Sequence, residues 1–105
     1  MEQLELIPIE AYTLELPADL TEYFLDAKGY FSAGVLIKGD QRYRLNFYDK
    51  YRLNQILDDL AALGRAFFEE NLVIVAELNR STIIAAAREL IRQHIELIPE
   101  SAPVK

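Results

Sequence analysis

His94 is the only histidine of the 105 residues and cysteine is absent, so few side chains could perform nucleophilic or acid–base chemistry. Histidine titrates near neutral pH without perturbation, which makes His94 the first candidate for a general base. No serine–histidine–aspartate or histidine–carboxylate pattern surrounds it. Its spacing from Leu90 and Ile91 places it at the rim of a helical apolar face, which favours a packed or capping histidine. We identify no catalytic residue, and a non-catalytic role is favoured.

Two pairs of adjacent acids, Asp58-Asp59 and Glu69-Glu70, are the next candidates, here for a divalent cation. Neighbouring residues on a helix point about 100° apart, so neither pair can chelate an ion by itself. The lack of cysteine also excludes disulfides, iron–sulfur clusters and cysteine-bound zinc. We therefore predict neither a metal site nor a cofactor.

A third pattern is the alternation of basic residues and tyrosines over residues 42–52, which contain four basic residues and three tyrosines. Such interleaving occurs where single-stranded nucleic acid stacks on a protein. The chain, however, has 17 acids against 11 bases, and residues 1–27 carry seven acids and no base. Neutralisation of Arg42 and Arg44 by Glu5, Glu10 and Glu15 of a neighbouring strand is favoured, and no nucleic-acid partner is predicted.

The fourth pattern is a strand–helix junction at residues 79–82. A helix N-terminus presents unpaired amides and a partial positive charge, which suits an anion. If the two long helices begin at the same edge of the sheet, several basic and hydroxyl side chains would converge there. This alternative hypothesis, a binder of a small phosphate-like anion, rests on Lys50, Arg52, Arg80, Ser81 and Thr82. Plain N-capping is the favoured interpretation of the same residues, and no glycine-rich phosphate loop is present.

The elements that position these residues follow from periodicity. Residues 4–16 alternate like a half-buried strand, and residues 18–28 are typical of a short helix. Two further strands run from Phe31 to Ile37 and from Tyr43 to Phe47, around a turn at residues 38–41. Between two turns that this sequence allows, we favour a three-residue loop that places Val35 opposite Tyr43. A two-residue loop would mix arginines with apolar side chains, unless both faces of the sheet are covered.

Two long helices complete the pattern. The first follows a capping Asp49 and carries leucines and an isoleucine at three- and four-residue spacing. It either ends at Gly64 or continues to about residue 70, and an end at Gly64 is favoured. Residues 72–76 are apolar and β-branched, which is typical of an interior strand. The second helix follows residues 79–82 and continues to His94.

These elements predict an α+β fold, a two-layer sandwich in which two long helices cover one face of a mixed four-stranded sheet. The order is strand, short helix, strand, strand, helix, strand, helix. The strand at 72–76 is expected to run parallel to the one at 43–47 and could lie beside either the first or the third strand. Residues 1–98 form the predicted single domain, and residues 99–105 a flexible tail.

With both helices on one face, the other face would expose apolar side chains that monomers rarely leave in water. We therefore expect a non-catalytic module that self-associates, with a dimer favoured, and that binds a protein partner through this face. The alternative is that residues 18–28 cover it. The predicted interface residues are Tyr30, Leu36, Arg42, Arg44 and Tyr48. No export signal or membrane span is recognised, so a cytoplasmic location without membrane contact is the expectation.

Overall fold

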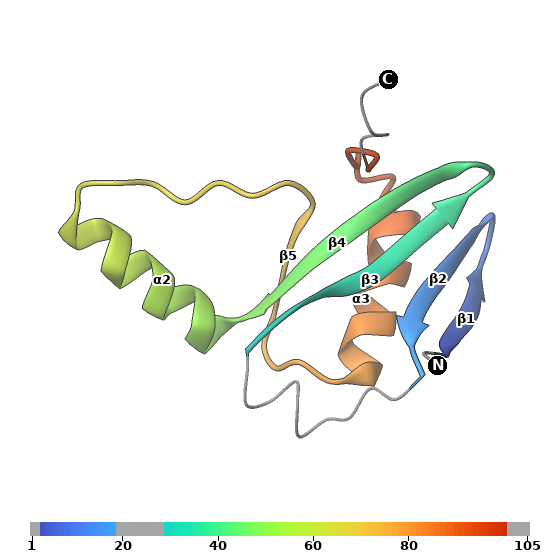
Figure 1. The fold of residues 1–105 in the computed structure, drawn as a ribbon, viewed down its shortest axis with the longest axis horizontal. Coiled ribbons are helices and arrows are strands. Elements are labelled where there is room, and N and C mark those ends of the chain that lie inside the picture. The colour runs from blue at the N-terminus through green and yellow to red at the C-terminus, as the bar shows by residue number, and fades with distance from the viewer. Residues whose placement is uncertain (1–2, 19–28, 101–105) are drawn as a thin grey trace.

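The computed structural model describes residues 3–18 and 29–100, which form an α+β fold with a five-stranded mixed sheet and two helices (Figure 1). The strands are β1 (Leu4–Ile9), β2 (Tyr12–Pro17), β3 (Tyr30–Lys38), β4 (Gln41–Asp49) and β5 (Leu72–Val75), and the helices are α2 (Lys50–Ala62) and α3 (Arg80–Arg92). The strands lie in the sheet in chain order. No helix in the described ranges is both long and apolar enough to cross a membrane.

The N-terminal acidic segment is a hairpin, which corrects the predicted count of four strands. β1 and β2 pair antiparallel with Ile9 opposite Tyr12, so Glu10 and Ala11 form the turn. Glu10 adopts a φ of 55°, in the left-handed region where glycine or asparagine is usual. The turn contains neither glycine nor asparagine, so nothing in the alternation of residues 4–16 indicated that the chain reverses direction there. The predicted helix at 18–28, and its suggested place over the sheet, fall on residues 19–28 and lie outside the described ranges.

The β3–β4 hairpin has a two-residue loop, Gly39-Asp40, so the favoured three-residue loop is wrong. Val35 lies opposite Arg44 and Leu36 opposite Tyr43. A bulge between Phe31 and Gly34 then shifts the register, so that Phe31 still pairs with Phe47 as predicted. The bulge allows apolar residues at both ends of β3 to face the same side despite the shorter loop.

This register decides which side chains face α3. We call the side of the sheet that packs on α3 the core face and the opposite side the back face. Leu36, Leu45 and Phe47 are completely buried on the core face. Around them lie the other members of the core: Ile9, Leu14, Leu16, Phe31, Leu78, Ile83 and Ala87. Val35, Arg42 and Arg44 alternate with these residues and therefore lie on the back face.

Helix α2 begins and ends where the sequence predicts. The Asp49 side chain accepts a 2.8 Å hydrogen bond from the amide of Arg52, which caps the first turn. Gly64, with a φ of 68°, and Arg65 donate to the carbonyls of Ala61 and Leu60, which is the Schellman pattern of a helix end. The prediction that Gly64 terminates the helix is confirmed.

The predicted layering is wrong for α2, because only α3 lies against the sheet. Figure 1 shows α2 extending away from the end of β4, with residues 63–71 returning beside it to β5. No residue of α2 is buried, whereas Ile83 and Ala87 of α3 are. β5 pairs with β4 in parallel, as predicted, beside the strand that precedes α2. It is the last strand in the sheet order, so the prediction of an interior strand is wrong.

Candidate functional site

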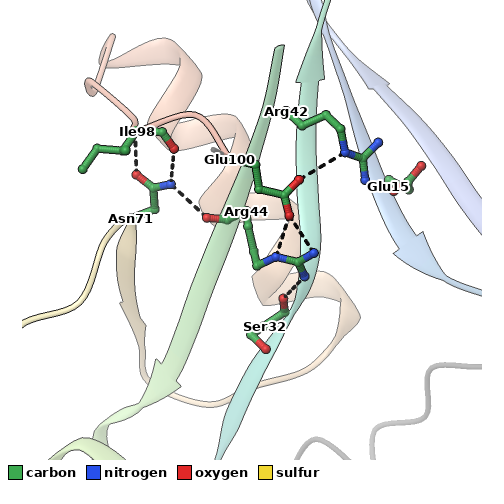
Figure 2. Close-up of polar contacts among 7 residues, drawn as sticks. All are labelled: Glu15, Ser32, Arg42, Arg44, Asn71, Ile98 and Glu100. Atoms are coloured by element: carbon green, nitrogen blue, oxygen red, sulfur yellow. Dashed lines mark hydrogen bonds and ion pairs between the residues drawn. The ribbon is translucent and has the colours of Figure 1, made fainter. Parts of the chain in front are cut away.

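The polar centre of the back face is a pair of arginines on β4. Arg42 and Arg44 are two residues apart on one strand, so their side chains lie on the same side of the sheet. Figure 2 shows the two guanidinium groups on either side of one carboxylate, that of Glu100. Arg44 Nε donates to Glu100 Oε2 at 2.9 Å, and Arg42 Nε donates to Oε1 at 3.3 Å. Each carboxylate oxygen thus faces a different arginine.

Both guanidinium groups are also held by the sheet itself. Arg42 Nη2 lies 3.0 Å from Glu15 Oε1 on β2, and Arg44 Nη1 donates to the carbonyl of Ser32 at 2.8 Å (Figure 2). The hydrogen bond that Arg42 donates to the Glu15 carboxylate is the main cause that raises the pKa of Arg42. We call Arg42, Arg44, Glu15 and Ser32 the arginine site. The predicted neutralisation by the acidic strand is confirmed for Arg42 and Glu15.

The other predicted acidic partners lie elsewhere. Glu5 is on β1 and pairs with Arg80 of α3, and Glu10 is in the β1–β2 turn. Arg44 instead forms an ion pair with Glu100, a residue that the sequence analysis assigned to a flexible tail. The backbone amide of Glu100 donates to the carbonyl of Arg42 at 2.7 Å, so main chain and side chain are both engaged. A separation of 56 and 58 residues leaves no local pattern that could have revealed these contacts.

The charge environment of Glu100 follows from this geometry. The hydrogen bond from Arg44 and the attraction of both guanidinium groups lower the pKa of the Glu100 carboxyl. Its side chain is one-third exposed, and those of Arg42 and Arg44 are 44% and 47% exposed. Such ion pairs are weak individually, about 0–1 kcal/mol each. Water and solutes therefore have access to the site.

Of the two tyrosines of the predicted interface, Tyr30 is half-buried and Tyr48 is covered by the chain. Tyr48 is only 6% exposed, because Tyr30 and Phe67 pack on its ring at centroid distances of 4.7 and 5.6 Å. Its hydroxyl donates to Glu69 at 2.5 Å. Segment 63–71, which sequence reasoning did not place here, thus supplies the cover through Phe67 and Glu69.

Leu36 lies on the core face of the sheet and not on the back face. The prediction that it lies on the uncovered face is wrong, since it is fully buried among the core residues beneath α3. The cause is the two-residue hairpin loop, which moves the residues of β3 between the bulge and the loop by one relative to the favoured pairing. Val35 takes the place on the back face and is nevertheless only 3% exposed.

The residues of the predicted anion site are not brought together. Arg80 Nε donates to Glu5 on β1 at 3.1 Å, whereas Lys50 and Arg52 follow β4, three strands away in the sheet order. Three strand spacings amount to roughly 14 Å. Ser81 is exposed in the first turn of α3. Thr82 is already engaged in capping.

That capping is a reciprocal pair of hydrogen bonds. Asn79 Oδ1 accepts from the Thr82 amide at 2.9 Å, and Thr82 Oγ1 accepts from the Asn79 amide at 3.0 Å. These bonds form a capping box, which satisfies the helix N-terminus without a ligand. The favoured interpretation of this junction as an N-cap is confirmed.

His94 ends α3. Its φ is 55°, and its amide and that of Ile95 donate to the carbonyls of Ile91 and Leu90, again a Schellman pattern. A shallow hollow of about 180 Å³ lies beside it, bordered by Glu10, Tyr12 and Lys38 among others. His94 is exposed, so of the two expected roles the structure supports the capping one and not the packed one. Within residues 3–18 and 29–100, no three histidine or acidic side chains gather as a metal site requires.

A second surface is apolar and belongs to the unpacked helix. The α2 stripe is the set of aliphatic side chains on one side of α2 and at its end: Leu53, Ile56, Leu57, Leu60 and Leu63. Leu57 and Leu63 are exposed, as is Phe68 in the returning segment, which has 87% of its surface in contact with solvent. The sequence pattern identified the stripe, but predicted that it would pack on the sheet.

These two surfaces, the arginine site and the α2 stripe, are what the geometry offers for function. Comparison with protein-family models, with curated proteins and with solved structures found no match. What the chain does must therefore be inferred from its own side chains.

Proposed function

We propose that this chain is a non-catalytic interaction module that pairs with a second copy of itself through the α2 stripe. The observation that carries the proposal is an amphipathic helix of 13 residues with none of them buried. Self-association was expected from uncovered apolar surface, and the proposal retains that expectation. It replaces the back face around Leu36 with α2 as the surface of contact.

The helix itself needs a partner. A 13-residue helix is marginal in water, because most helix stability in proteins comes from packing of the apolar face. In the single chain, α2 is anchored at its first turn by the Asp49 cap, beside Gly29, whose carbonyl accepts from the Asp49 amide at 3.0 Å. Beyond that turn it extends away from the sheet (Figure 1). A second copy would supply the missing packing.

The charges of α2 favour an antiparallel second copy. Lys50 and Arg52 are in the first turn, while Asp58 and Asp59 are in the second half, and the last turn contains no base. This order opposes the helix dipole, which favours acids at the N-terminus and bases at the C-terminus. In an antiparallel pair, the basic end of each helix faces the acidic end of the other. A two-fold axis makes such a surface complementary to itself.

The apolar surface sets the expected strength of the pair. Leu57, Leu63 and Phe68 are 42%, 69% and 87% exposed. Burial of these side chains on both copies would contribute on the order of 10 kcal/mol. Association costs roughly 4–15 kcal/mol in lost freedom, so the net free energy is modest. We therefore expect a dimer that dissociates on dilution.

The test is the mass of the full chain in solution, measured by light scattering across a concentration range. We expect a dimer of the 12.1 kDa chain that dissociates on dilution, and a monomer throughout for Leu57→Glu. The matched control is Leu6→Glu, the same change at an exposed leucine of β1, which leaves the dimer intact. A wild-type monomer at every concentration, or a dimer that Leu57→Glu leaves intact, would contradict the proposal.

Charge reversal tests the antiparallel arrangement. Arg52→Glu and Asp59→Arg each place a charge where the helix dipole prefers it, so each stabilises the isolated helix. Each also introduces repulsion across the antiparallel pair. We expect either variant alone to weaken the dimer about tenfold and the double variant to restore it. Two weakening effects that simply add in the double variant would exclude this arrangement.

A further inference from the structure

We propose that the arginine site binds an acidic residue from an extended peptide of a partner protein, and that Glu100 of the same chain occupies the site in the free protein. The site was expected to take part in a protein interface. The structure adds the chemistry of the partner, because a carboxylate is already seated between Arg42 and Arg44 (Figure 2).

The first support is the balance of charge. Within the sheet, Arg42 and Arg44 carry two positive charges and Glu15 one negative charge, so the sheet residues of the site leave one positive charge uncompensated. One carboxylate completes the balance, and Glu100 provides it. Arginine clusters recognise acidic motifs in this way, through charge-assisted hydrogen bonds.

The second support is preorganisation. Arg42 is held by Glu15 and Arg44 by the carbonyl of Ser32, with polar atoms 3.0 and 2.8 Å apart. Neither contact depends on Glu100. The guanidinium groups therefore stay oriented when Glu100 leaves, and an incoming carboxylate meets donors that are already in place. A preorganised site loses less entropy on binding.

The third support is the backbone beside the site. β5 pairs with β4 only from Asn46 to Asp49, so the part of the same β4 edge that precedes Asn46 is left for residues 98–100. Asn71 Nδ2 donates to the carbonyls of Ile98 and Arg44, at 2.8 and 2.9 Å, and its Oδ1 accepts from the Ile98 amide (Figure 2).

Together with the bond from the Glu100 amide to the Arg42 carbonyl, these contacts hold the segment as a strand addition would. The occupant that fits is therefore an extended peptide. Its acidic residue follows, by two positions, the residue whose backbone Asn71 binds.

Residues 98–100 of the chain itself can be displaced from the arginine site. The Glu100 ion pairs are exposed, and the Ile98 side chain is 49% exposed, so neither contributes much binding energy. A partner peptide that adds apolar contacts or a second acid can displace it. The proposal shares with the proposed function only the idea of an interaction module. It does not use the α2 stripe, so either can fail while the other stands.

The experiment measures binding of a labelled synthetic peptide, acetylated and amidated, with the sequence of residues 96–102. The protein is the full chain carrying Glu100→Ala, which removes the competing carboxylate from between Arg42 and Arg44 without removing any backbone. We expect this variant to bind the peptide at least about tenfold more tightly than the wild type, in which Glu100 competes. Arg44→Gln in the same background weakens binding by about tenfold or more, the effect of losing one or two charge-assisted hydrogen bonds.

Two controls separate recognition from loss of fold or from bulk charge. Arg88→Gln removes an exposed arginine of α3 and leaves the affinity unchanged. A peptide with glutamine at the position of Glu100 binds the Glu100→Ala protein at least about tenfold more weakly, although the protein is the same. Equal binding of both peptides, equal binding to wild type and Glu100→Ala, or no binding at all would overturn the proposal.

Discussion

Arg44 and Glu100 are 56 positions apart in the chain, yet Arg44 Nη2 lies 2.7 Å from Glu100 Oε2. The contact ties the segment after α3 to the back face of the sheet, on the side opposite α3. The pKa of the Glu100 carboxyl therefore reports whether this segment is bound to the sheet.

We expect the pKa of Glu100, measured by carboxyl NMR, to lie below that of an ordinary glutamate, about 4.3. The cause is the hydrogen bond from Arg44, with a further contribution from Arg42. Because the folded pKa is lowered, the stabilisation is present above the unfolded value and is lost as pH falls through the folded value. The segment is therefore expected to detach on acidification.

Arg44→Gln is expected to raise the pKa of Glu100 toward the ordinary value, and Arg88→Gln to leave it unchanged. High salt acts in the same direction as Arg44→Gln, because it screens exposed charges. If the pKa of Glu100 is the same in Arg44→Gln as in the wild type, the carboxylate does not lie between the two arginines.

Tyr48 offers a test of the cover over the back face. Its buried hydroxyl donates to the Glu69 carboxylate, and Phe67 packs on its ring. We expect Tyr48→Phe to lower the free energy of unfolding by about 1–2 kcal/mol, measured in urea, because a hydrogen bond to a charged acceptor is lost. Tyr51→Phe is the control, since Tyr51 is 72% exposed, and should change little.

The same environment makes the stability of the wild type fall at high pH. Burial, followed by the bond to Glu69, raises the pKa of Tyr48 well above 10. The unfolded chain ionises this phenol at lower pH than the folded chain, so stability is lost as pH rises past about 10. Tyr48→Phe should reduce that loss, and an identical alkaline slope in both proteins would argue against the buried hydroxyl.

The junction between β3 and α2 can be tested at Gly29. Its φ is 66°, and an added Cβ would lie 2.8 Å from Arg52 Cβ and 3.0 Å from Asp49 Oδ1. Gly39 has a φ of 63° with no atom within 4 Å of an added Cβ. We expect Gly39→Ala to cost roughly 1 kcal/mol of backbone strain and Gly29→Ala clearly more, in urea unfolding. Equal losses of unfolding free energy in the two variants would mean that Gly29 does not pack as closely against Asp49 and Arg52 as the structure shows.

The residues of the arginine site show how far sequence reasoning reaches. The bond between Arg42 and Glu15 was predictable, because alternation assigns Arg42 to one face and the acidic strand offers partners there. Glu100 was not predictable, since no periodicity links it to β4. Leu36 was placed on the wrong face because the short loop and the bulge together alter the register, and such a choice depends on what covers each face.

Local interactions were within reach of the sequence by itself: the strands at 30–38, 41–49 and 72–75, the caps at Asp49 and Asn79, the helix end at Gly64 and the parallel crossover. Each depends on hydrogen bonds or periodicity over a few neighbouring residues. Only the tertiary structure decided that α2 would leave the sheet, that Phe67 would cover Tyr48 and that Glu100 would reach Arg44. Those outcomes depend on contacts between distant segments, for which the amino-acid pattern allows several arrangements of similar energy.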